Sequence, residues 1–260
     1  MSMMSMMSRM SRMPRMSRPI LLAGALLICF EAGAEPLRVV TTSMEPFFYE
    51  ENGEPRGIEY DILRYYAKAE GRELEMVWVD SFKDVLPALE RGEAELASAA
   101  ITITDARKKR FNFSSAYFPA QLVLVQRTGE VAKDLASLSG SRIGVLAGST
   151  SLEALSGIDV EMVRAANTLE LYQAVVAGET QGAVTSTARV VLILQNFETL
   201  DVSLHLGEKE EFGFATAKGS TLATSLSEHI GKIKRSGIYF RLLETYLGSK
   251  AAAIVQAGSR

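Results

Sequence analysis

A guanidinium and a set of hydroxyl groups are the side chains of this chain whose types and spacing could do chemistry. Arg107 follows Thr102 and Thr104 in the segment 99–118, AAITITDARKKRFNFSSAYF, where a β-branched strand pattern gives way to a helix pattern. A guanidinium can donate two parallel hydrogen bonds to one carboxylate. Four cations near a helix start oppose the helix macrodipole, and such locally unfavourable choices are typical of functional positions. The segment therefore suits a carboxylate ligand, with a solvated charge run as the alternative.

Hydroxyl groups gather at three places where a strand pattern runs straight into a helix pattern. These junctions hold Thr102 with Thr104, Ser149 with Thr150, and Thr185 with Ser186 and Thr187. The first residues of a helix also leave backbone N–H groups without an intrahelical partner. Each junction therefore offers polar groups to a ligand, although helix capping alone is sufficient to explain any one of them.

Catalytic and metal-binding patterns are missing from the sequence after residue 34. Its two histidines, His205 and His229, lie near no nucleophilic serine or cysteine pattern. No pair of His, Cys or carboxylate residues has metal-ligand spacing, and no phosphate loop or dinucleotide fingerprint occurs. The carboxylates are scattered, so no acid pair indicates general acid–base catalysis. We therefore expect a protein that is not an enzyme and that uses no metal and no cofactor.

Residues 1–34 have the features of a secretory signal peptide. Four arginines in a Met/Ser-rich stretch precede an apolar run over 20–30, which is short for a membrane span, and the cleavage signal AGA at 32–34 follows. An N-terminal membrane anchor is the alternative. Cys29 raises the question of a lipoprotein, but bulky Ile28 precedes it where a small residue is expected. We expect cleavage after residue 34 and a periplasmic location.

The composition of residues 35–260 narrows the classes of partner. Cleavage changes the net charge from −3 to −6, because it removes four arginines and one glutamate. An acidic balance argues against a nucleic-acid partner. No cysteine remains, and a chain of this length can bury a sufficient core without disulfides. We expect a soluble, exported monomer.

Hydrophobic periodicity predicts alternating strands and helices in the first half of the chain. The expected strands are 37–41, 73–79 and 94–102, and the expected helices are 58–70 and 81–91. Ser81 and Asp84 resemble a capping pair for the second helix. Pro87 inside that helix predicts an irregular or late first turn. The order β-α-β-α-β implies a parallel sheet with helices on both faces.

A second set of elements begins near residue 121. The expected strands are 121–126, 141–146, 182–186 and 212–217, and two C-terminal helices over 221–247 are broken at Gly237. Thr150 with Glu153 and Asn167 with Glu170 form capping boxes. We therefore expect an α/β fold of two lobes with a ligand cleft between them. Residues 35–120 form the first part of lobe 1, 121–211 form lobe 2, and 212–260 form the crossover and the return to lobe 1 with its C-terminal helices.

Four segments in this order resemble the bacterial family 3 extracellular solute-binding proteins, the polar amino-acid receptors of ABC importers. They are LRVVTTSMEPFFYEENGEPRGIEYDIL, SFKDVLPALERGEAELASAAITITDARKKRFNFSSAYF, SRIGVLAGSTSLEAL and FGFATAKGS with SGIYFRLLETYLG. The resemblance covers nearly all of residues 37–248. It implies a type II periplasmic-binding-protein fold, in which two α/β lobes joined by two crossover strands close on the ligand like a hinge.

The resemblance also implies roles for particular residues. The implied ligand contacts are Arg107, Thr102 and Ala100, the wall residue Phe82, and Ser149 and Thr150 of lobe 2. In this family, the arginine in the position of Arg107 pairs with the α-carboxylate of the ligand. A bound anion would neutralise the cations at the helix start, which accounts for their unfavourable placement.

The sequence departs from the family pattern at two implied contact positions. Met44 stands where an aromatic residue is usual, so one wall of the site is softer. Ser186 stands where an Asp usually anchors the α-ammonium of the ligand. A buried ammonium without a charged partner is costly. Three explanations are open: another acid takes the place of this Asp, the ligand is a carboxylate without an α-ammonium, or ligand binding has been lost.

Three functions remain open. The first is a periplasmic solute-binding protein that captures a small carboxylate-bearing ligand, an amino acid or a related compound, for an ABC permease. The second is a sensory or regulatory binding module without its own importer, as in lytic transglycosylases and some sensor kinases, which would act through another protein. The third is an enzyme similar to cyclohexadienyl dehydratases, which needs an acid for proton transfer that the junction at Ser186 and Thr187 does not supply.

Overall fold

The computed structural model describes residues 34–258, and within that range it describes the side chains of all but 191–195 and 249–258. The expected signal peptide therefore lies outside the described residues, apart from residue 34. By its internal contacts the chain divides after Ala32, and the unit Gly33–Arg260 contains every element discussed below. Among the described helices, none is long and apolar enough to cross a membrane.

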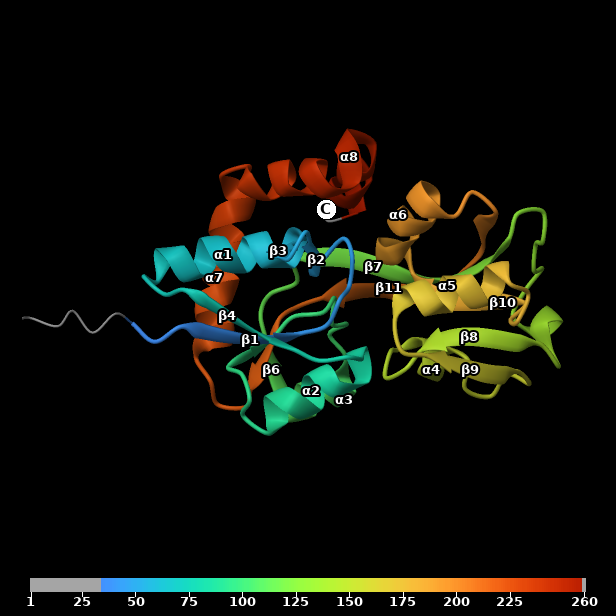
Figure 1. The fold of residues 1–260 in the computed structure, drawn as a ribbon, viewed down its shortest axis with the longest axis horizontal. Coiled ribbons are helices and arrows are strands. Elements are labelled where there is room, and N and C mark those ends of the chain that lie inside the picture. The colour runs from blue at the N-terminus through green and yellow to red at the C-terminus, as the bar shows by residue number, and fades with distance from the viewer. Residues whose placement is uncertain (1–33, 259–260) are drawn as a thin grey trace, which may run out of the picture. The chain divides into compact units, whose positions relative to one another are not determined.

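The first sheet has five strands in the order β4-β1-β5-β12-β6 (Figure 1). These strands are β1 (Leu37–Thr41), β4 (Leu74–Trp78), β5 (Leu96–Ala97), β6 (Phe111–Phe113) and β12 (Ala215–Ala217). Strand β1 is parallel to β4 and β5, as the alternation of strands and helices predicted. Strand β12 runs antiparallel to both β5 and β6.

Helices pack against this sheet and against one another. They are α1 (Ile58–Ala69), α2 (Phe82–Glu90), α3 (Asp105–Arg110), α7 (Leu222–Arg235) and α8 (Ile238–Gly258). Helix α1 contacts β4, and α2 contacts β1 and β5. The short hairpin of β2 (Tyr49–Glu51) and β3 (Glu54–Arg56) precedes α1. We call this sheet, with its helices, lobe 1.

The second sheet also has five strands, in the order β11-β7-β10-β8-β9. They are β7 (Phe118–Arg127), β8 (Arg142–Leu146), β9 (Glu161–Ala165), β10 (Gly182–Ser186) and β11 (Leu200–Phe212). Its helices are η1 (Ala136–Leu138), α4 (Ser151–Ala154), α5 (Thr168–Val176) and α6 (Thr187–Asn196). We call this sheet, with its helices, lobe 2.

The chain passes twice between the two sheets. It leaves lobe 1 between β6 and β7, and it returns between β11 and β12. Strands β7 and β11 are antiparallel neighbours, and the residues at the two crossings, Phe118 and Phe212, are a direct pair. The expected α/β fold of two lobes is confirmed, whereas the exact boundaries of the lobes stay a prediction.

Among the described residues, buried side chains form two cores within lobe 2 and one centred on lobe 1, which also includes Leu146 and Ala188 of lobe 2. Along β7, Val123 and Val125 enter one core of lobe 2, and Leu122 and Leu124 enter the other. Successive residues of a strand point to opposite faces, so this sheet is buried on both sides. Helix α5 covers one of these faces with Tyr172 and neighbouring apolar side chains.

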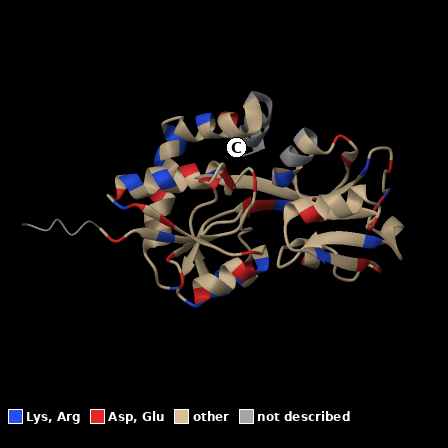
Figure 2. Cartoon of the chain, viewed as in Figure 1, with Lys and Arg blue, Asp and Glu red and all other residues tan. Residues whose placement is uncertain are grey.

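Charged side chains of both signs are mixed over the helices and loops, and the central strands of the first sheet carry few of them (Figure 2). The predicted apolar face of α1 is buried, and the break at Gly237, whose φ is +76°, separates α7 from α8. Strand 94–102 was predicted too long, because only Leu96–Ala97 pair as β5 and the residues after them form an irregular loop.

Two capping predictions are wrong, and one of the two alternatives predicted from Pro87 is confirmed. Ser81 precedes α2 without a side-chain cap, since its hydroxyl donates instead to the Ala166 carbonyl of lobe 2 at 3.3 Å. Thr150 makes no side-chain cap on α4. Helix α2 contains Pro87 and begins at Phe82, so it does not start late. Its first turn is irregular, because the Asp84 N–H donates to the Ser81 carbonyl, only three residues earlier, at 2.9 Å. Asn167 does cap α5, accepting from the Glu170 N–H at 2.9 Å.

Candidate functional site between the lobes

The loop that follows β5 brings Ala100 and Thr102 to the edge of lobe 1. Ala100 has a φ of +51°, and its N–H donates to Glu59 Oε1 at 3.0 Å. The backbone of Thr102 forms an isolated antiparallel β-bridge with that of Phe212. The Thr102 hydroxyl donates to Glu210 Oε2 at 3.4 Å. The Thr104 hydroxyl accepts from the Arg107 N–H at 3.2 Å and caps α3.

Helix α3 has only six residues, and this changes the meaning of its charges. Arg107 and the three cations after it lie in the last turn, where they complement the helix dipole. The prediction that these cations oppose the dipole is therefore wrong. The case for Arg107 as a ligand-binding residue depends on where its guanidinium lies.

The Arg107 guanidinium bridges the two lobes. Nη1 donates to the Thr102 carbonyl at 2.8 Å within lobe 1, and Nη2 donates to the Gly148 carbonyl of lobe 2 at 3.1 Å. The guanidinium carbon lies 5.8 Å from the centre of the Phe82 ring. Burial lowers the pKa of Arg107, while the carboxylates of Glu153 and Glu210 raise it. The predicted residues Arg107, Thr102 and Phe82 thus lie together.

Lobe 2 contributes the turn between β8 and α4 to this place. Gly148 has a φ of +78° and packs so closely on lobe 1 that an added Cβ would lie 2.9 Å from the Lys83 Cα. The hydroxyl of the predicted residue Ser149 donates to the Leu146 carbonyl at 2.7 Å. Both Ser149 and Thr150 are half-buried. The turn approaches Arg107 through a backbone carbonyl.

Met44 and Ser186 are joined by a residue that the sequence analysis missed. Arg189, on the first turn of α6, donates from Nε to Met44 Sδ at 3.0 Å and from Nη1 to Ser186 Oγ at 3.3 Å. Thr168 Oγ1 also lies 3.6 Å from Met44 Sδ. Met44 belongs to lobe 1 and the other three residues to lobe 2, so this cluster is a second bridge between the lobes.

Arg189 is a buried cation with neutral hydrogen-bond partners. Arg189 as a whole residue is only 5% exposed. Burial lowers its pKa, and Tyr172, Glu210, Tyr117 and Glu59 raise it. The sequence alone could have pointed to Arg189, because it is the one charged residue in the otherwise neutral helix TARVVLILQN.

No carboxylate oxygen among the described side chains lies within 4.0 Å of either guanidinium, that of Arg107 or that of Arg189. Both arginines hydrogen-bond across the boundary between the lobes. The positive charge of Arg189 lowers the pKa of Arg107. The site therefore holds one arginine from each lobe without a direct ion pair, while the carboxylates of Glu153, Glu210 and Glu59 raise the pKa of one or both.

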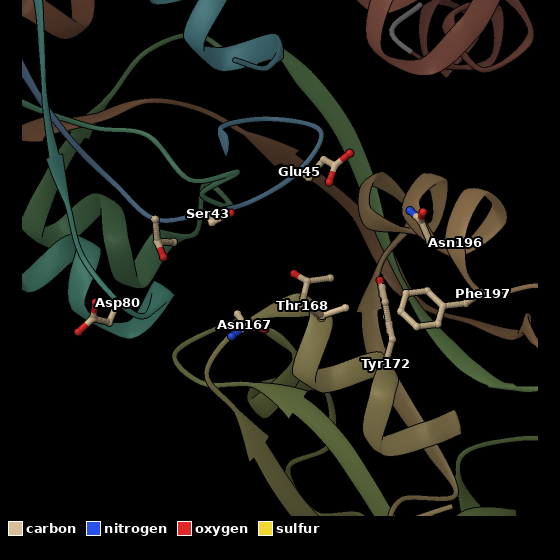
Figure 3. A pocket seen from close by; sticks show the side chains of 10 residues that line it. Ser43, Glu45, Asp80, Asn167, Thr168, Tyr172, Asn196 and Phe197 are labelled. Carbon is tan, nitrogen blue, oxygen red and sulfur yellow. The ribbon is translucent and has the colours of Figure 1, made fainter. Parts of the chain in front are cut away.

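A cavity of about 550 Å³ opens beside this region (Figure 3). Lobe 1 lines it with Thr42, Ser43, Glu45 and Asp80, and lobe 2 lines it with Asn167, Thr168, Leu169, Tyr172, Asn196 and Phe197. None of the eight predicted ligand contacts is among these residues. Thr168, which contacts Met44, and Tyr172, whose hydroxyl donates to the Arg189 carbonyl at 3.3 Å, connect the cavity to Arg189.

Ala100 differs from the other predicted contacts, because its N–H is already bound to Glu59. Glu59 is fully buried and also accepts from the Tyr117 hydroxyl. Desolvation raises its pKa to about 7, against the lowering effect of these hydrogen bonds. In the part of the chain that the structure describes, no three His, Cys, Asp or Glu side chains form a group that could hold a metal ion.

Comparison with known proteins identifies the family. The model of the bacterial extracellular solute-binding proteins, family 3, matches residues 37–249. Membrane-bound lytic murein transglycosylase F of Pseudomonas fluorescens (strain Pf0-1) is 26% identical over 223 residues, covering 82% of this chain and 46% of that protein. Amino-acid-binding protein AabA of Dichelobacter nodosus is 26% identical over 222 residues, covering 82% of this chain and 88% of the relative.

Among solved structures, an ancestral arginine-binding protein bound to arginine matches with a TM-score of 0.76 and 30% identity, over 82% of this chain and 98% of that one. The chain thus spans about half the length of the transglycosylase and nearly all of the two binding proteins. It belongs to the family 3 bacterial extracellular solute-binding proteins, and its fold is the type II periplasmic-binding-protein fold.

Proposed function

We propose that this family 3 protein is a periplasmic receptor that captures a small carboxylate-bearing ligand, an amino acid or a related compound, between its two lobes. The observation that carries the proposal is the Arg107 guanidinium, which reaches from lobe 1 to the Gly148 carbonyl of lobe 2 and has no carboxylate partner among the described residues. A ligand carboxylate would satisfy this cation and contact both lobes at once. Closure is then driven by contacts that exist only when the lobes meet.

The proposed contacts are those predicted from the sequence, with Arg107 as their centre. Thr102 and Phe82 lie against its guanidinium, and Ser149 and Thr150 follow the Gly148 carbonyl. The amino-acid-binding relatives support a ligand of this size and polarity. Delivery of the ligand to an ABC permease, by a monomeric receptor exported with a signal peptide, is part of the proposal.

Ligand binding by the full-length chain and its Arg107→Ala variant tests this function. A thermal-shift panel should hold the common L-amino acids, opines, and mono- and dicarboxylates without an amino group. A ligand at a hundredfold its dissociation constant stabilises the fold by roughly 2.7 kcal/mol, which is a readable rise in melting temperature. We expect Arg107→Ala to abolish the rise and to keep the ligand-free melting temperature.

Lys109→Ala is the matched control, because Lys109 is an exposed cation on the same short helix. It should bind as the wild type does. An Arg107→Ala variant that binds as tightly as the wild type would show that the site assignment is wrong.

A regulatory binding module is the second candidate, and the match to murein transglycosylase F favours it. In that case the ligand would change the activity of another protein instead of being imported. A permease and ATPase gene pair beside the gene for this chain would support the importer role. Binding without any uptake defect in a deletion strain would support the regulatory one.

Binding rather than catalysis is also part of the proposal. A dehydratase needs an acid for proton transfer, and the junction at Ser186 holds a hydroxyl that accepts from Arg189. Incubation with prephenate or arogenate should therefore yield no aromatic product. Formation of that product by the purified chain would establish an enzyme instead.

A further inference from the structure

Arg189 is a buried cation that has no carboxylate oxygen within 4.0 Å among the described side chains. Burying a guanidinium is costly unless an anion and full hydrogen bonding compensate for the lost water. Here its two hydrogen bonds go to a thioether and a hydroxyl, which are weak, neutral acceptors. A guanidinium has five N–H donors in a planar fork, which suits a second carboxylate.

The guanidinium of Arg189 lies at the boundary between the lobes. It contacts Met44 of lobe 1 from the first turn of a ten-residue helix in lobe 2. The N-terminus of that helix adds partial positive charge at the same place. The 550 Å³ cavity lies next to these groups, because two of its lining residues, Thr168 and Tyr172, contact Met44 and the Arg189 carbonyl. Glu45 and Asp80 also line the cavity, whereas neither arginine does, so the ligand is placed here between the two guanidiniums and not in the cavity.

The charges around Arg189 also select against a ligand ammonium. A cation brought beside a buried guanidinium is repelled, and Ser186 offers no negative charge to offset this repulsion. An anion at the same place would neutralise Arg189 and reduce the repulsion between Arg189 and Arg107. The two guanidiniums thus suit two negative groups on one ligand, in competition with the carboxylates of Glu59 and Glu210, which also act on Arg189.

We propose that Arg189 is a second anion-binding residue, and that the ligand is a small dianion, such as a dicarboxylate without an α-ammonium, held by Arg107 at one end and by Arg189 at the other. This inference rests on the proposed function, because it assumes a ligand carboxylate at Arg107. It replaces the amino acid in that proposal by a different class of compound.

The test compares dicarboxylates with matched ligands that lack one charge. Calorimetry on the full-length chain would use malonate, succinate, glutarate and adipate, the corresponding monocarboxylates, and the common L-amino acids. We expect one dicarboxylate to bind more tightly than its monocarboxylate and than every L-amino acid. In Arg189→Met its affinity should fall roughly thirtyfold or more, while the monocarboxylate affinity changes by less than about threefold.

Two further variants separate a binding role from a structural one. Arg164→Met removes an exposed arginine of lobe 2 and should leave every affinity unchanged. Arg189→Lys keeps the charge without the fork and should bind the dicarboxylate with intermediate affinity. Without ligand, Arg189→Met should still unfold in one cooperative transition, which shows that the variant is folded and that a loss of affinity reflects binding.

Failure of this inference and failure of the proposed function give different results. If an L-amino acid binds most tightly, or if Arg189→Met leaves dicarboxylate affinity unchanged, the dianion inference is overturned and the receptor function stands. Absence of dicarboxylate binding at millimolar concentration overturns it as well. If the bound ligand is indifferent to Arg107→Ala, the proposed function itself fails.

Discussion

The Glu59 carboxylate accepts a hydrogen bond from the Ala100 backbone N–H at 3.0 Å, and this bond ties the first turn of α1 to the loop that leads to Arg107. The same carboxylate accepts from the Tyr117 hydroxyl, and Tyr117 follows β6. Its other oxygen, Oε2, is buried without a hydrogen-bond partner among the described residues. A buried acid thus holds the loop in its left-handed conformation at Ala100.

Stability should depend on the ionisation of Glu59. Its pKa rises from 4.5 to about 7 on folding, so the folded state binds the proton more tightly than the unfolded state. The unfolding free energy should therefore fall as the pH rises from about 4.5 and should level off above about 7. The size of this fall is on the order of 3 kcal/mol, since one pKa unit corresponds to about 1.4 kcal/mol.

Glu59→Gln isolates this contribution, because glutamine keeps the acceptor oxygen and does not titrate. Urea unfolding at pH 4.5, 6 and 8 should show the variant gaining stability over the wild type as the pH rises. Glu208→Gln, which changes an exposed carboxylate, should follow the wild-type profile. Parallel curves for Glu59→Gln and the wild type would contradict the assignment.

Close packing of Gly148 on Lys83 should control closure. A Cβ at Gly148 would lie 2.9 Å from the Lys83 Cα and 3.1 Å from its Cβ, so Gly148→Ala forces the lobes apart. Overpacking of this kind costs roughly 1–3 kcal/mol, and we expect ligand affinity to fall roughly tenfold. Calorimetry with the bound ligand measures the effect.

Gly157→Ala is the control for backbone strain. Gly157 has a similar φ of +85°, and beyond its chain neighbours no atom lies within 4 Å of the position that a Cβ would occupy there. Gly148→Ala should lose at least as much stability as Gly157→Ala, and only Gly148→Ala should lose affinity. Equal affinities would mean that the approach of Gly148 to Lys83 is unimportant for binding.

The two capping boxes should differ in strength. Asn167 accepts from the Glu170 N–H, whereas the Thr150 side chain makes no cap. Asn167→Ala should therefore lower the unfolding free energy by about 1 kcal/mol, and Thr150→Ala should change it by less than about 0.5 kcal/mol. Denaturant titration of both variants checks this, and equal losses would contradict the observed difference.

Elements with a strong local hydrophobic pattern were predictable from the sequence. Strand β1, helix α1 and strand β10 lie where the sequence placed them. Strand β6 was not expected, because its pairing partner, β12, lies about a hundred residues further along the chain. The start of β6 at Phe111 also ends α3 early, and that is why the charges of α3 fall in its last turn.

The candidate site was predictable only in part. Arg107, Thr102 and Phe82 lie close together because the loop and α2 belong to one sheet edge. Arg189 was not predicted as a site residue, because the sequence around a single cation in an apolar helix does not show which part of the fold its side chain contacts. Only tertiary structure places it against Met44, which is 145 residues away along the chain.

The pairing of Phe118 with Phe212 limits how the lobes can move. Both connections between the lobes pass through this one pair of neighbouring strands, so neither connection can shift without the other. Sliding of the lobes would break the pairing, whereas bending about the pair preserves it. We therefore expect the lobes to rotate about one axis, and we expect any ligand that closes them to produce the same rotation. Residues 35–260 contain no cysteine, so dyes on one introduced thiol in each lobe would convert that rotation into an optical signal, whatever the ligand is.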